Sequence, residues 1–524
     1  MASENQVNQD QLETGRKIYM EGLLPSGQPV KAFVQNDIAL SEEQASCGSC
    51  HRKSGMGSSE GQQVVPAIAG RILFNPLQIP TSKPPEAPIL RPAYTDQSLR
   101  RAITSGLGAD GYPLDPNMPR YNLSEQDLDA VVAYLKMLSS EYSPGVDEGV
   151  IHFATIVAGD ASESAQDAHM AVMNKFLKQK NTETRHEGKR AENAPWHKKW
   201  ILGNYRKWKL HTWKLTGPAD SWAEQLASYY RTAPVFAVIG GVAGGSWQPV
   251  HDFCQSNRLP CIFPTTNLPV ISDSDFYPLY LSKGMFLEGE AVADQIALAG
   301  LGDKKAVQVY TKGDQKAATA AEGLRKTLGE NGGDVQDVVL TSDHDMSADT
   351  LSELSSAEVL VLWLKWQDIE KIWSQITAKG IPGNLYLSSS LAGKPSADVG
   401  TSLRDKALFV HTQGLPGQLH RLLARSTGWL RANRIYKPEH KHVQGNAFFA
   451  LKAAGDAVTN IRGFFLRDYF IERIEHMVDN APYTSVYPRI TLAPNQRFVS
   501  KGYIISRLGK SGRHMAVTDW VAPR

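Results

Sequence analysis

The most reactive side chains of this 524-residue chain lie together in the segment CGSCH, at Cys47, Cys50 and His51. Two thiols three positions apart on one helical turn can reach the two vinyl groups of a haem and form thioethers, and the histidine that follows then lies beneath the iron. Such a short match can also arise by chance or mark a dithiol redox pair, so the flanking sequence has to decide. The pattern predicts one covalent haem c, with His51 as an iron ligand.

Two methionines are candidates for the second iron ligand. Met118 precedes Pro119 in a loop, and a thioether ligand there raises the potential of the iron and closes the site to exogenous ligands. Met56 is the alternative, but it lies only five residues after His51 in a glycine-rich loop, too near to cross easily to the opposite haem face. We therefore predict His51 and Met118 as the metal ligands. Pro66 could offer a carbonyl to the other nitrogen of His51 and so fix the orientation of the ring.

Two helical patterns flank these residues. The segment QLETGRKIYMEG is amphipathic, and Gly15 and Tyr19 are spaced so that another helix can approach closely. Later, Ser124 followed by Asp127 resembles a capping box with Asp in place of the usual Glu. The helix that it opens contains Tyr134 and a regular series of apolar residues. The sequence therefore predicts a helix on each side of the CGSCH segment.

The order of these features resembles class I cytochrome c over residues 8–140. The attachment site, the Pro66 segment, the Met-Pro loop and the last helix with Tyr134 follow one another as in that family. The resemblance implies an all-α domain in which Pro66 and Tyr134 belong to the haem-binding residues. The stretch 23–46 is longer than the family pattern, so the haem edge is expected to be covered differently.

The remaining two cysteines, Cys254 and Cys261, lie in DFCQSNRLPC between a predicted helix and the next strand. In an oxidising compartment this pair can form a local disulfide, provided that the geometry allows it. Two buried thiols are the alternative. We predict the disulfide.

Residues 141–149 look like a polar linker, and after Val150 short β-rich segments alternate with amphipathic helical ones. Strands that alternate with helices favour parallel sheets covered on both faces. This part is too long for one sheet, so two α/β lobes are expected. The predicted strands are VIHFATIV, VFAVIGG, CIFPTT, AVQVYT, VQDVVL, EVLVLWL, NLYLSS and ALFVHT.

The order of these elements, the IFPTTN loop and the closing YPRITLAPNQRFVSKGYII segment resemble the type I periplasmic binding proteins, the branched-chain amino-acid receptor family, over residues 150–524. The resemblance implies two α/β lobes that close on a small solute, as in ABC transporter receptors. The first lobe would comprise about 150–285 with part of 400–450, and the second about 286–395 with C-terminal segments. The fold class is therefore multidomain, an all-α cytochrome c domain followed by this two-lobed fold.

By matching position, that resemblance also implies ligand-binding residues at strand ends of both lobes. Those of the first lobe are Gly159, Asp160, Ser162, Gly244, Ser246, Trp247, Thr265, Thr266 and Asn267, and those of the second are Tyr310, Trp366 and Ser390.

Two departures from the receptor pattern concern the ligand. Gly244 stands where amino-acid receptors carry a serine for the ligand carboxylate, and Ser390 stands where they carry an acidic residue for its ammonium. A buried ammonium without a carboxylate partner is costly, so a plain amino acid is disfavoured. Trp247, Trp363 and Trp366 could stack on a flat solute, although each of them alone is more typical of a core.

Composition and charge limit the classes of function. The net charge of +2 gives no global attraction to nucleic acid or membrane, and no run of 18 apolar residues occurs. Because haem is attached to cysteines outside the bacterial cytoplasm, we expect a periplasmic protein whose export signal has been removed. Between 175 and 214, Lys and Arg outnumber Glu and alternate with four tryptophans, Trp196 and Trp200 among them. A solvated basic face or a docking surface for an acidic redox partner fits this segment.

The sequence thus favours an electron-transfer protein whose solute-binding module brings the haem near a captured compound, with a dehydrogenase or another cytochrome as redox partner. We predict no catalytic residue, because no Ser/His/Asp constellation, flavin fingerprint or nicotinamide fingerprint is present. The alternatives are a redox enzyme acting on a solute in the cleft, and a ligand sensor or transport receptor with a haem reporter.

Overall fold

The computed structural model describes residues 2–523 except 36, 42, 61–62, 79–88, 193–204, 273, 342–345, 381, 394, 396–399 and 481–482. Trp196 and Trp200 therefore lie outside the described residues. The chain divides into two units: one holds 1–150, 182–207 and 457–473, and the other holds 151–181, 208–456 and 474–524. We describe each unit by itself.

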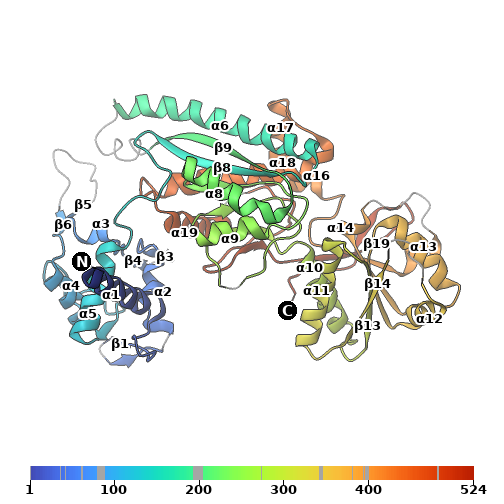
Figure 1. Ribbon diagram of the computed structural model, residues 1–524, viewed down its shortest axis with the longest axis horizontal. Coiled ribbons are helices and arrows are strands. Elements are labelled where there is room, and N and C mark those ends of the chain that lie inside the picture. Colours follow the sequence, from blue (N-terminus) through green and yellow to red (C-terminus); the bar gives the residue numbers. More distant parts are fainter. Residues whose placement is uncertain are drawn as a thin grey trace. The chain divides into compact units, whose positions relative to one another are not determined.

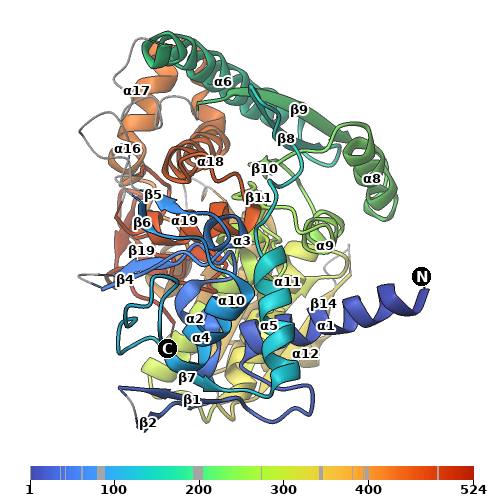
Figure 2. The same ribbon diagram turned by 90° about the vertical axis from the view of Figure 1, so that its left-hand side faces the viewer.

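The first unit is built around two helices that cross closely, α1 (Ala2–Glu21) and α5 (Glu125–Met137) (Figure 2). Gly15 makes the crossing possible, because a Cβ at this position would lie 2.1 Å from the backbone oxygen of Ala130. The rings of Tyr19 and Tyr134 pack against each other at the same crossing, with centroids 5.4 Å apart. The predicted helix pair is therefore present. Three shorter helices complete the α-helical part: α2 (Cys47–His51), α3 (Gly70–Leu73) and α4 (Asp96–Ser105).

This unit is not all-α, which corrects the sequence-based expectation. Strands β1 (Lys31–Val34), β2 (Ile38–Ala39) and β7 (Arg120–Asn122) form an antiparallel sheet in the order β2-β1-β7. Two hairpins add β3 (Ser58–Glu60) with β4 (Gln63–Val65), and β5 (Leu77–Gln78) with β6 (Ile89–Arg91). The extra stretch 23–46 supplies β1 and β2, and β1 pairs with the segment that directly follows Met118.

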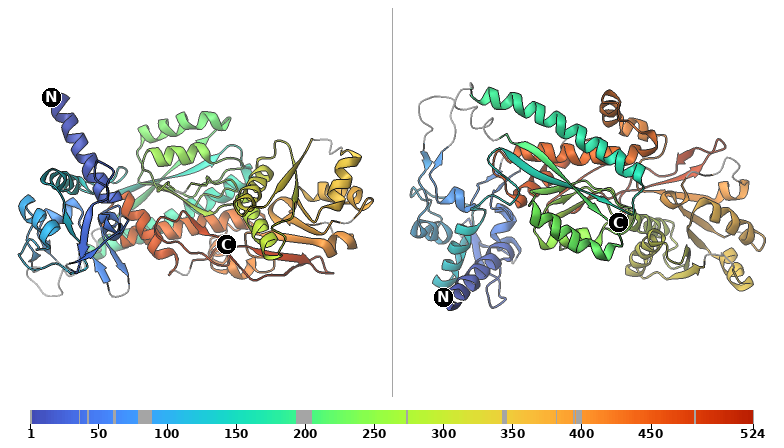
Figure 3. Two further views of the ribbon diagram at one scale, coloured as in Figure 1. Left: turned by 90° about the horizontal axis from the view of Figure 1, so that it is seen from below. Right: turned by 45° about the horizontal axis from the view of Figure 1, so that its top comes forward.

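Two sheets form the second unit. The first has the order β18-β12-β11-β10-β8-β9, with parallel pairing from β18 to β8. Its strands are β8 (Val150–Ala158), β9 (Lys207–Leu215), β10 (Ala237–Ile239), β11 (Cys261–Ile262), β12 (Pro278–Ser282) and β18 (Phe498–Ser500). Helices α8 (Trp222–Thr232) and α9 (Gln248–Ser256) cover one face, while α6 (Glu163–Glu192) and α18 (Lys441–Asn460) lie along the other (Figures 1 and 3).

The second sheet has the order β14-β13-β15-β16-β17-β19-β20, parallel as far as β17 and antiparallel beyond it. Its strands are β13 (Ala306–Thr311), β14 (Val335–Leu340), β15 (Val359–Trp363), β16 (Asn384–Ser388), β17 (Ala407–His411), β19 (Ile504–Leu508) and β20 (His514–Ala516). The helices on its faces are α10 (Met285–Leu298), α11 (Gln315–Glu330), α12 (Ala348–Ser356) and α13 (Trp366–Thr377) (Figure 1).

Strand β15 shows why this sheet is buried on both sides. All five of its side chains are buried, as expected for an uninterrupted apolar run in a parallel sheet. Val359, Val361 and Trp363 pack with α10 and α11, whereas Leu360 and Leu362 pack with α12 and α13. The period of two along the strand therefore sends alternate residues into two separate cores.

Three connections join the two sheets. The chain leaves the first sheet after β12, returns from β17 to β18, and crosses again between β18 and β19. The second connection contains α16 (Leu419–Leu422), α17 (Ala424–Ala432), α18 and α19 (Arg467–Val478). The resemblance implied two α/β lobes, and the structure has two, linked by three crossovers.

Candidate functional site

Helix α2 places Cys47, Cys50 and His51 on one helical turn. The side chain of Ser46 caps this turn by accepting a hydrogen bond from the backbone nitrogen of Ser49, at 3.2 Å. Cys47 is half-buried and Cys50 is exposed, and both carry free thiols. Burial raises the pKa of the Cys47 thiol to about 11. The short helix thus presents two unpaired thiols and an imidazole within five residues.

The His51 side chain is buried, and its Nδ1 lies 2.9 Å from the carbonyl oxygen of Pro66. A carbonyl can only accept, so Nδ1 carries the proton and Nε2 is left as the coordinating nitrogen. Burial lowers the pKa of His51, and the Pro66 carbonyl opposes this shift. The neutral imidazole that results is the form that binds a metal. The contact between His51 and Pro66 has the geometry proposed from the sequence.

Met118 and Met56 occupy different surroundings. Met118 is half-buried against the apolar cluster of this unit, on which Cys47 also packs, and Met56 does not belong to that cluster. The backbone of Met118 is held at both ends: its nitrogen donates to the oxygen of Asp115 at 2.9 Å, and its oxygen accepts from the guanidinium of Arg120. Met118 therefore packs against the same apolar cluster as Cys47, whereas Met56 does not.

Three tyrosines support the haem segment. The hydroxyl of Tyr19 donates to the backbone oxygen of Arg52 at 2.7 Å, directly after helix α2. The hydroxyl of Tyr121 lies 3.8 Å from the sulfur of Cys47. Tyr134, expected among the haem-binding residues, packs on Tyr19 at the helix crossing. Sequence reasoning missed the contact of Tyr121, because it is 74 positions away from Cys47.

Glu472 is a second residue that sequence reasoning missed. Its carboxylate accepts hydrogen bonds from the backbone nitrogen and the hydroxyl of Ser54, at 2.8 and 2.5 Å, although the two residues are 418 positions apart. Burial raises the pKa of Glu472 to about 8, and the bonds from Ser54 oppose this shift. Ser139 also donates to the backbone oxygen of Ser54, at 2.7 Å. The loop after His51 is therefore fixed from two distant segments.

These residues fit a covalent haem c. Two free thiols on one turn, a buried neutral imidazole with its Nδ1 engaged, and an apolar cluster that includes Met118 are the donors and the surroundings that this group requires. When bound, the haem supplies one-electron redox chemistry. Cys47 and Cys50 would tether it and His51 would ligate its iron. Pro66 holds the proton on Nδ1.

The second unit contains a cleft of about 440 Å³ between its two lobes. The residues that line it come from the loops and helix starts after β10 and β11 in the first lobe and after β13, β15 and β16 in the second. They are Gly244, Gly245, Leu268, Gly313, Asp314, Gln315, Lys316, Lys365, Ser390 and Leu391. All of these loops follow the carboxyl ends of parallel strands, where ligands of such sheets bind.

Of the residues expected to bind a ligand, Gly244 and Ser390 line this cleft, and Asp160 bonds to the backbone of Gly244. Most of the others make local contacts. The hydroxyl of Ser162 accepts from the nitrogen of Ala165, that of Ser246 from Gln248 and that of Thr266 from Leu268, while the backbones of Gly159, Thr265 and Asn267 bond to Leu215, Gly241 and Met285.

The structure does not place the three tryptophans where they could stack on a flat solute in the cleft. Trp247, Trp363 and Trp366 are all buried within apolar cores, and the indole nitrogen of Trp363 donates to Gln308. Tyr310 donates its hydroxyl to Asp337 on the neighbouring strand, at 3.1 Å. The rings of the three tryptophans pack inside the apolar cores of the two sheets. None of the four aromatic residues lines the cleft.

Ser390 has a partner that the sequence did not reveal. Glu288, on α10, is completely buried and accepts hydrogen bonds from the hydroxyls of Ser388 and Ser390. Burial raises the pKa of Glu288 to about 7, and the two serines oppose this shift. A carboxyl group therefore lies one hydrogen bond behind the serine where amino-acid receptors carry an acidic residue.

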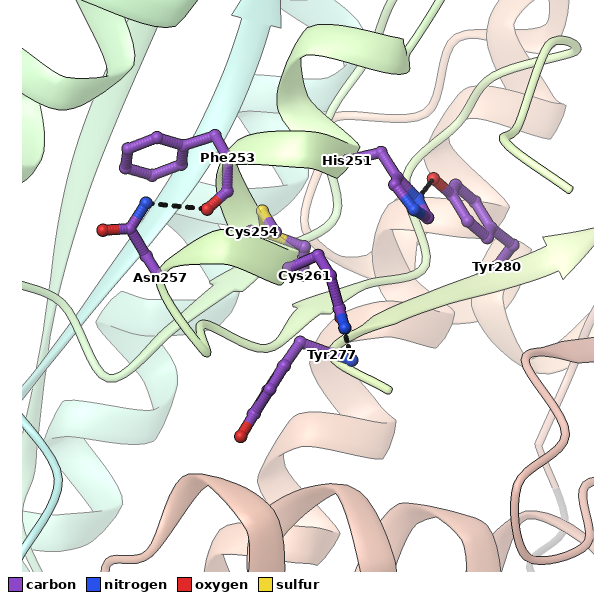
Figure 4. Close-up of a disulfide and its surroundings, with 8 residues drawn as sticks. His251, Phe253, Cys254, Asn257, Cys261, Tyr277 and Tyr280 are labelled. Carbon is purple, nitrogen blue, oxygen red and sulfur yellow. Dashed lines mark hydrogen bonds between the residues drawn. A yellow bond between two sulfur atoms is a disulfide. The ribbon is translucent and has the colours of Figure 1, made fainter. Parts of the chain in front are cut away.

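Cys254 and Cys261 form the predicted disulfide, with their Cα atoms 6.1 Å apart (Figure 4). The bond links the end of α9 to the start of β11. On the same helix, His251 contacts the hydroxyl of Tyr280 at 2.8 Å and a carboxylate oxygen of Asp275 at 2.7 Å. The disulfide thus belongs to the framework of the first lobe, near the end of the helix that follows Gly244 and Gly245.

Comparison with known proteins gives one family match, over the haem segment. Residues 39–139 match the family model described as cytochrome c. No curated protein matches the chain. Among solved structures, a leucine-binding protein from Thermotoga maritima is similar, with 14% identity, a TM-score of 0.48 and coverage of 71% of this chain and 99% of that one.

Two further solved structures are similar to the same extent. A putative branched-chain amino acid ABC transporter from Rhodospirillum rubrum has 12% identity, a TM-score of 0.49 and coverage of 70% and 99%. A solute-binding protein from R. palustris in complex with benzoate has 14% identity, a TM-score of 0.45 and coverage of 72% and 97%. The two-lobed fold itself follows from the strand order and the three connections.

Among the described residues, no helix combines the length and the hydrophobicity needed to cross a membrane. In that same part of the chain, no group of three or more His, Cys, Asp or Glu is placed to hold a metal ion. Residues 39–139 form a cytochrome c domain, and the α/β part of the chain has the two sheets and three connections described above.

Proposed function

We propose that this chain is a periplasmic electron-transfer protein in which a haem c domain is fused to a solute-binding module. The domain limits of this proposal are 8–140 for the haem part, 141–149 for the linker and 150–524 for the two lobes. The observation that carries it is the contact between His51 Nδ1 and the Pro66 carbonyl, 2.9 Å long, beside two free thiols on one helical turn. This arrangement prepares His51 Nε2 for iron.

Each residue has one task in this proposal. Cys47 and Cys50 would attach the haem, and His51 and Met118 would ligate its iron. The protein holds the proton on Nδ1 of His51 and packs Met118 against apolar side chains. A thioether ligand from Met118 would raise the potential of the iron. The cleft of the second unit captures a small solute, and a separate redox protein exchanges electrons with the haem.

The experiment is production of the chain with an intact cytochrome c maturation system. We expect a coloured product on a denaturing gel and a mass equal to the chain plus one haem. Cys47→Ala combined with Cys50→Ala should abolish both signals. A colourless wild-type product with the mass of the bare chain refutes the haem assignment.

Stopped-flow reduction then separates an electron carrier from a redox enzyme. For a carrier, the oxidised haem is reduced rapidly by a reduced redox protein and not by cleft ligands alone. Rapid reduction by a bound solute without any protein partner would identify an enzyme that oxidises this solute.

A further inference from the structure

The glycine turn of the first lobe is closed by the chain's own carboxylate. Gly244 and Gly245 both line the cleft, and their backbone nitrogens donate to Asp160, at 2.9 Å to Oδ1 and 2.7 Å to Oδ2. Asp160 follows β8, and the glycines follow its parallel neighbour β10. The two N–H groups that a ligand carboxylate could use are therefore already paired.

The absence of side chains at these glycines is required for this closure. A Cβ on Gly244 would lie 2.3 Å from the backbone oxygen of Asp160, and one on Gly245 would lie 2.9 Å from its Oδ2. A serine at position 244 would collide with the Asp160 backbone. The turn and the aspartate thus fit each other, and Gly244 is explained by Asp160 rather than by a ligand.

The opposite side of the cleft carries two cationic side chains. Lys316 follows β13 and Lys365 follows β15, which is the neighbouring strand, so both stand at the same edge of the sheet. Within the described residues, neither ammonium group forms an ion pair or a side-chain hydrogen bond. A ligand anion can supply the missing partner.

Among the described residues, the carboxylates of Asp160, beside the cleft, and of Asp314, in its lining, already accept hydrogen bonds from backbone nitrogens. Asp314 caps helix α11, where one of its oxygens accepts from the nitrogens of Lys316 and Ala317, at 3.0 and 3.2 Å. Glu288 is completely buried behind the serine hydroxyls. The ammonium of an amino acid would have to compete with these backbone nitrogens for a counter-charge, and an ammonium that is desolvated without one is unfavourable.

We propose that the cleft binds an organic anion that lacks an ammonium group, that Lys316 and Lys365 hold its charge, and that Asp160 is the specificity-determining residue that keeps ligand carboxylates off the glycine turn. This inference rests on the solute-binding part of the proposed function and names its ligand class.

The test is isothermal titration calorimetry on the full haem-containing chain with a matched pair of probes. 4-Methylpentanoate and L-leucine share a carboxylate and a branched side chain and differ in the ammonium group; benzoate is a third, flat anion. We expect 4-methylpentanoate or benzoate to bind at least tenfold more tightly than L-leucine. Equal or tighter binding of L-leucine overturns the inference.

Lysine variants test which side chains bind the charge of the ligand. Lys365→Met and Lys316→Met should each weaken binding of the anion about tenfold, as loss of one charged hydrogen bond implies. The control is Lys379→Met, because Lys379 is exposed just beyond the other end of helix α13. If the three variants bind alike, the lysines do not hold the ligand.

Asp160→Ala tests the closed turn. Removing the carboxylate frees both N–H groups, so the loss caused by Lys365→Met should become at least threefold smaller on this background. Asp160→Asn keeps one acceptor oxygen but, because its amide NH2 cannot accept, frees one of the two N–H groups, so its loss should fall between those of the parent chain and of Asp160→Ala. Unchanged sensitivity in Asp160→Ala, with a native circular dichroism spectrum, contradicts the role of Asp160.

Mass spectrometry of compounds released from the purified protein distinguishes failure of the anion inference from failure of the solute-binding function. A neutral or cationic solute in the cleft overturns the anion inference and leaves the solute-binding function standing. An empty cleft, together with no heat from any probe, defeats both.

Discussion

The haem site and the cleft are specified by the sequence in different ways. The thiols and the imidazole of the haem site lie within five consecutive residues, and the Pro66 carbonyl comes 15 positions after His51. The cleft collects its lining from loops between Gly244 and Leu391, each following a different strand. Local spacing encodes the first site, whereas strand order encodes the second. Chemistry fixed by spacing can be recognised from a short segment; chemistry fixed by topology requires the fold.

Each of the two regions contains a buried glutamate that accepts hydrogen bonds from serine. Glu472 accepts from Ser54 beside the haem segment, and Glu288 accepts from Ser388 and Ser390 behind the cleft. Each reaches its serine partner across at least 100 positions of sequence. Even the locally encoded haem site is therefore supported by a distant carboxyl group.

The largest expected effect is loss of the haem from the first unit while the cleft of the second unit keeps its ligand affinity. Cys47→Ala combined with Cys50→Ala should give complete loss of covalent haem, because no thiol remains to form a thioether. Binding of 4-methylpentanoate in the cleft should change less than threefold. Haem-dependent mass and calorimetry on the same sample check both statements. If ligand affinity falls with the haem, the two sites are coupled.

The methionine variants test the locally encoded site further. Met118→Ala should lower the haem potential by on the order of 100 mV, since axial ligands set potentials over a range of about 0.8 V. Met56→Ala is the matched control and should leave the potential nearly unchanged, because Met56 lies outside the apolar cluster. Spectroelectrochemistry measures both variants. A larger shift for Met56→Ala would assign it as the ligand instead.

The sequence predicted the parts of the molecule that local patterns determine. The crossing at Gly15, the His51–Pro66 contact, the alternation of strands and helices and the Cys254–Cys261 pair all reflect spacing or periodicity. It did not predict the strands around 23–46, which depend on pairing with the segment after Met118.

The sequence also could not predict which side chains of a helix or strand are buried. The three tryptophans and the two glutamates are ordinary residues of amphipathic or apolar segments, and their sequence context does not tell which face they occupy. Asp160 was expected to contact a ligand and instead bonds to Gly244 and Gly245. Only the adjacency of β8 and β10 brings these residues together.

The next largest effect concerns the pH dependence of the haem unit. Burial raises the pKa of Glu472 to about 8, so the folded unit keeps a proton that the unfolded chain releases near pH 4.5. Its contribution to stability is complete below pH 4.5 and is lost as the pH rises to about 8, a difference of roughly 5 kcal/mol. Glu472→Gln should flatten this loss in chemical unfolding followed by haem absorbance. A pH profile identical to that of the wild type would show that Glu472 does not titrate in this range.

A smaller loss of the same sign is expected in the second unit. Burial raises the pKa of Glu288 to about 7, so its contribution to stability is complete below pH 4.5 and falls by roughly 3 kcal/mol as the pH rises to 7. Glu288→Gln keeps the shape, removes the titration and should flatten the unfolding profile of this unit, followed by tryptophan fluorescence, without changing that of the haem absorbance. Because Glu288 orients Ser390, the same variant should weaken binding of the anion by about threefold. If Glu288→Gln instead changed the pH dependence of unfolding followed by haem absorbance, the two regions would unfold in one transition. The two sites would then be encoded separately in the sequence, but their stabilities would not be independent.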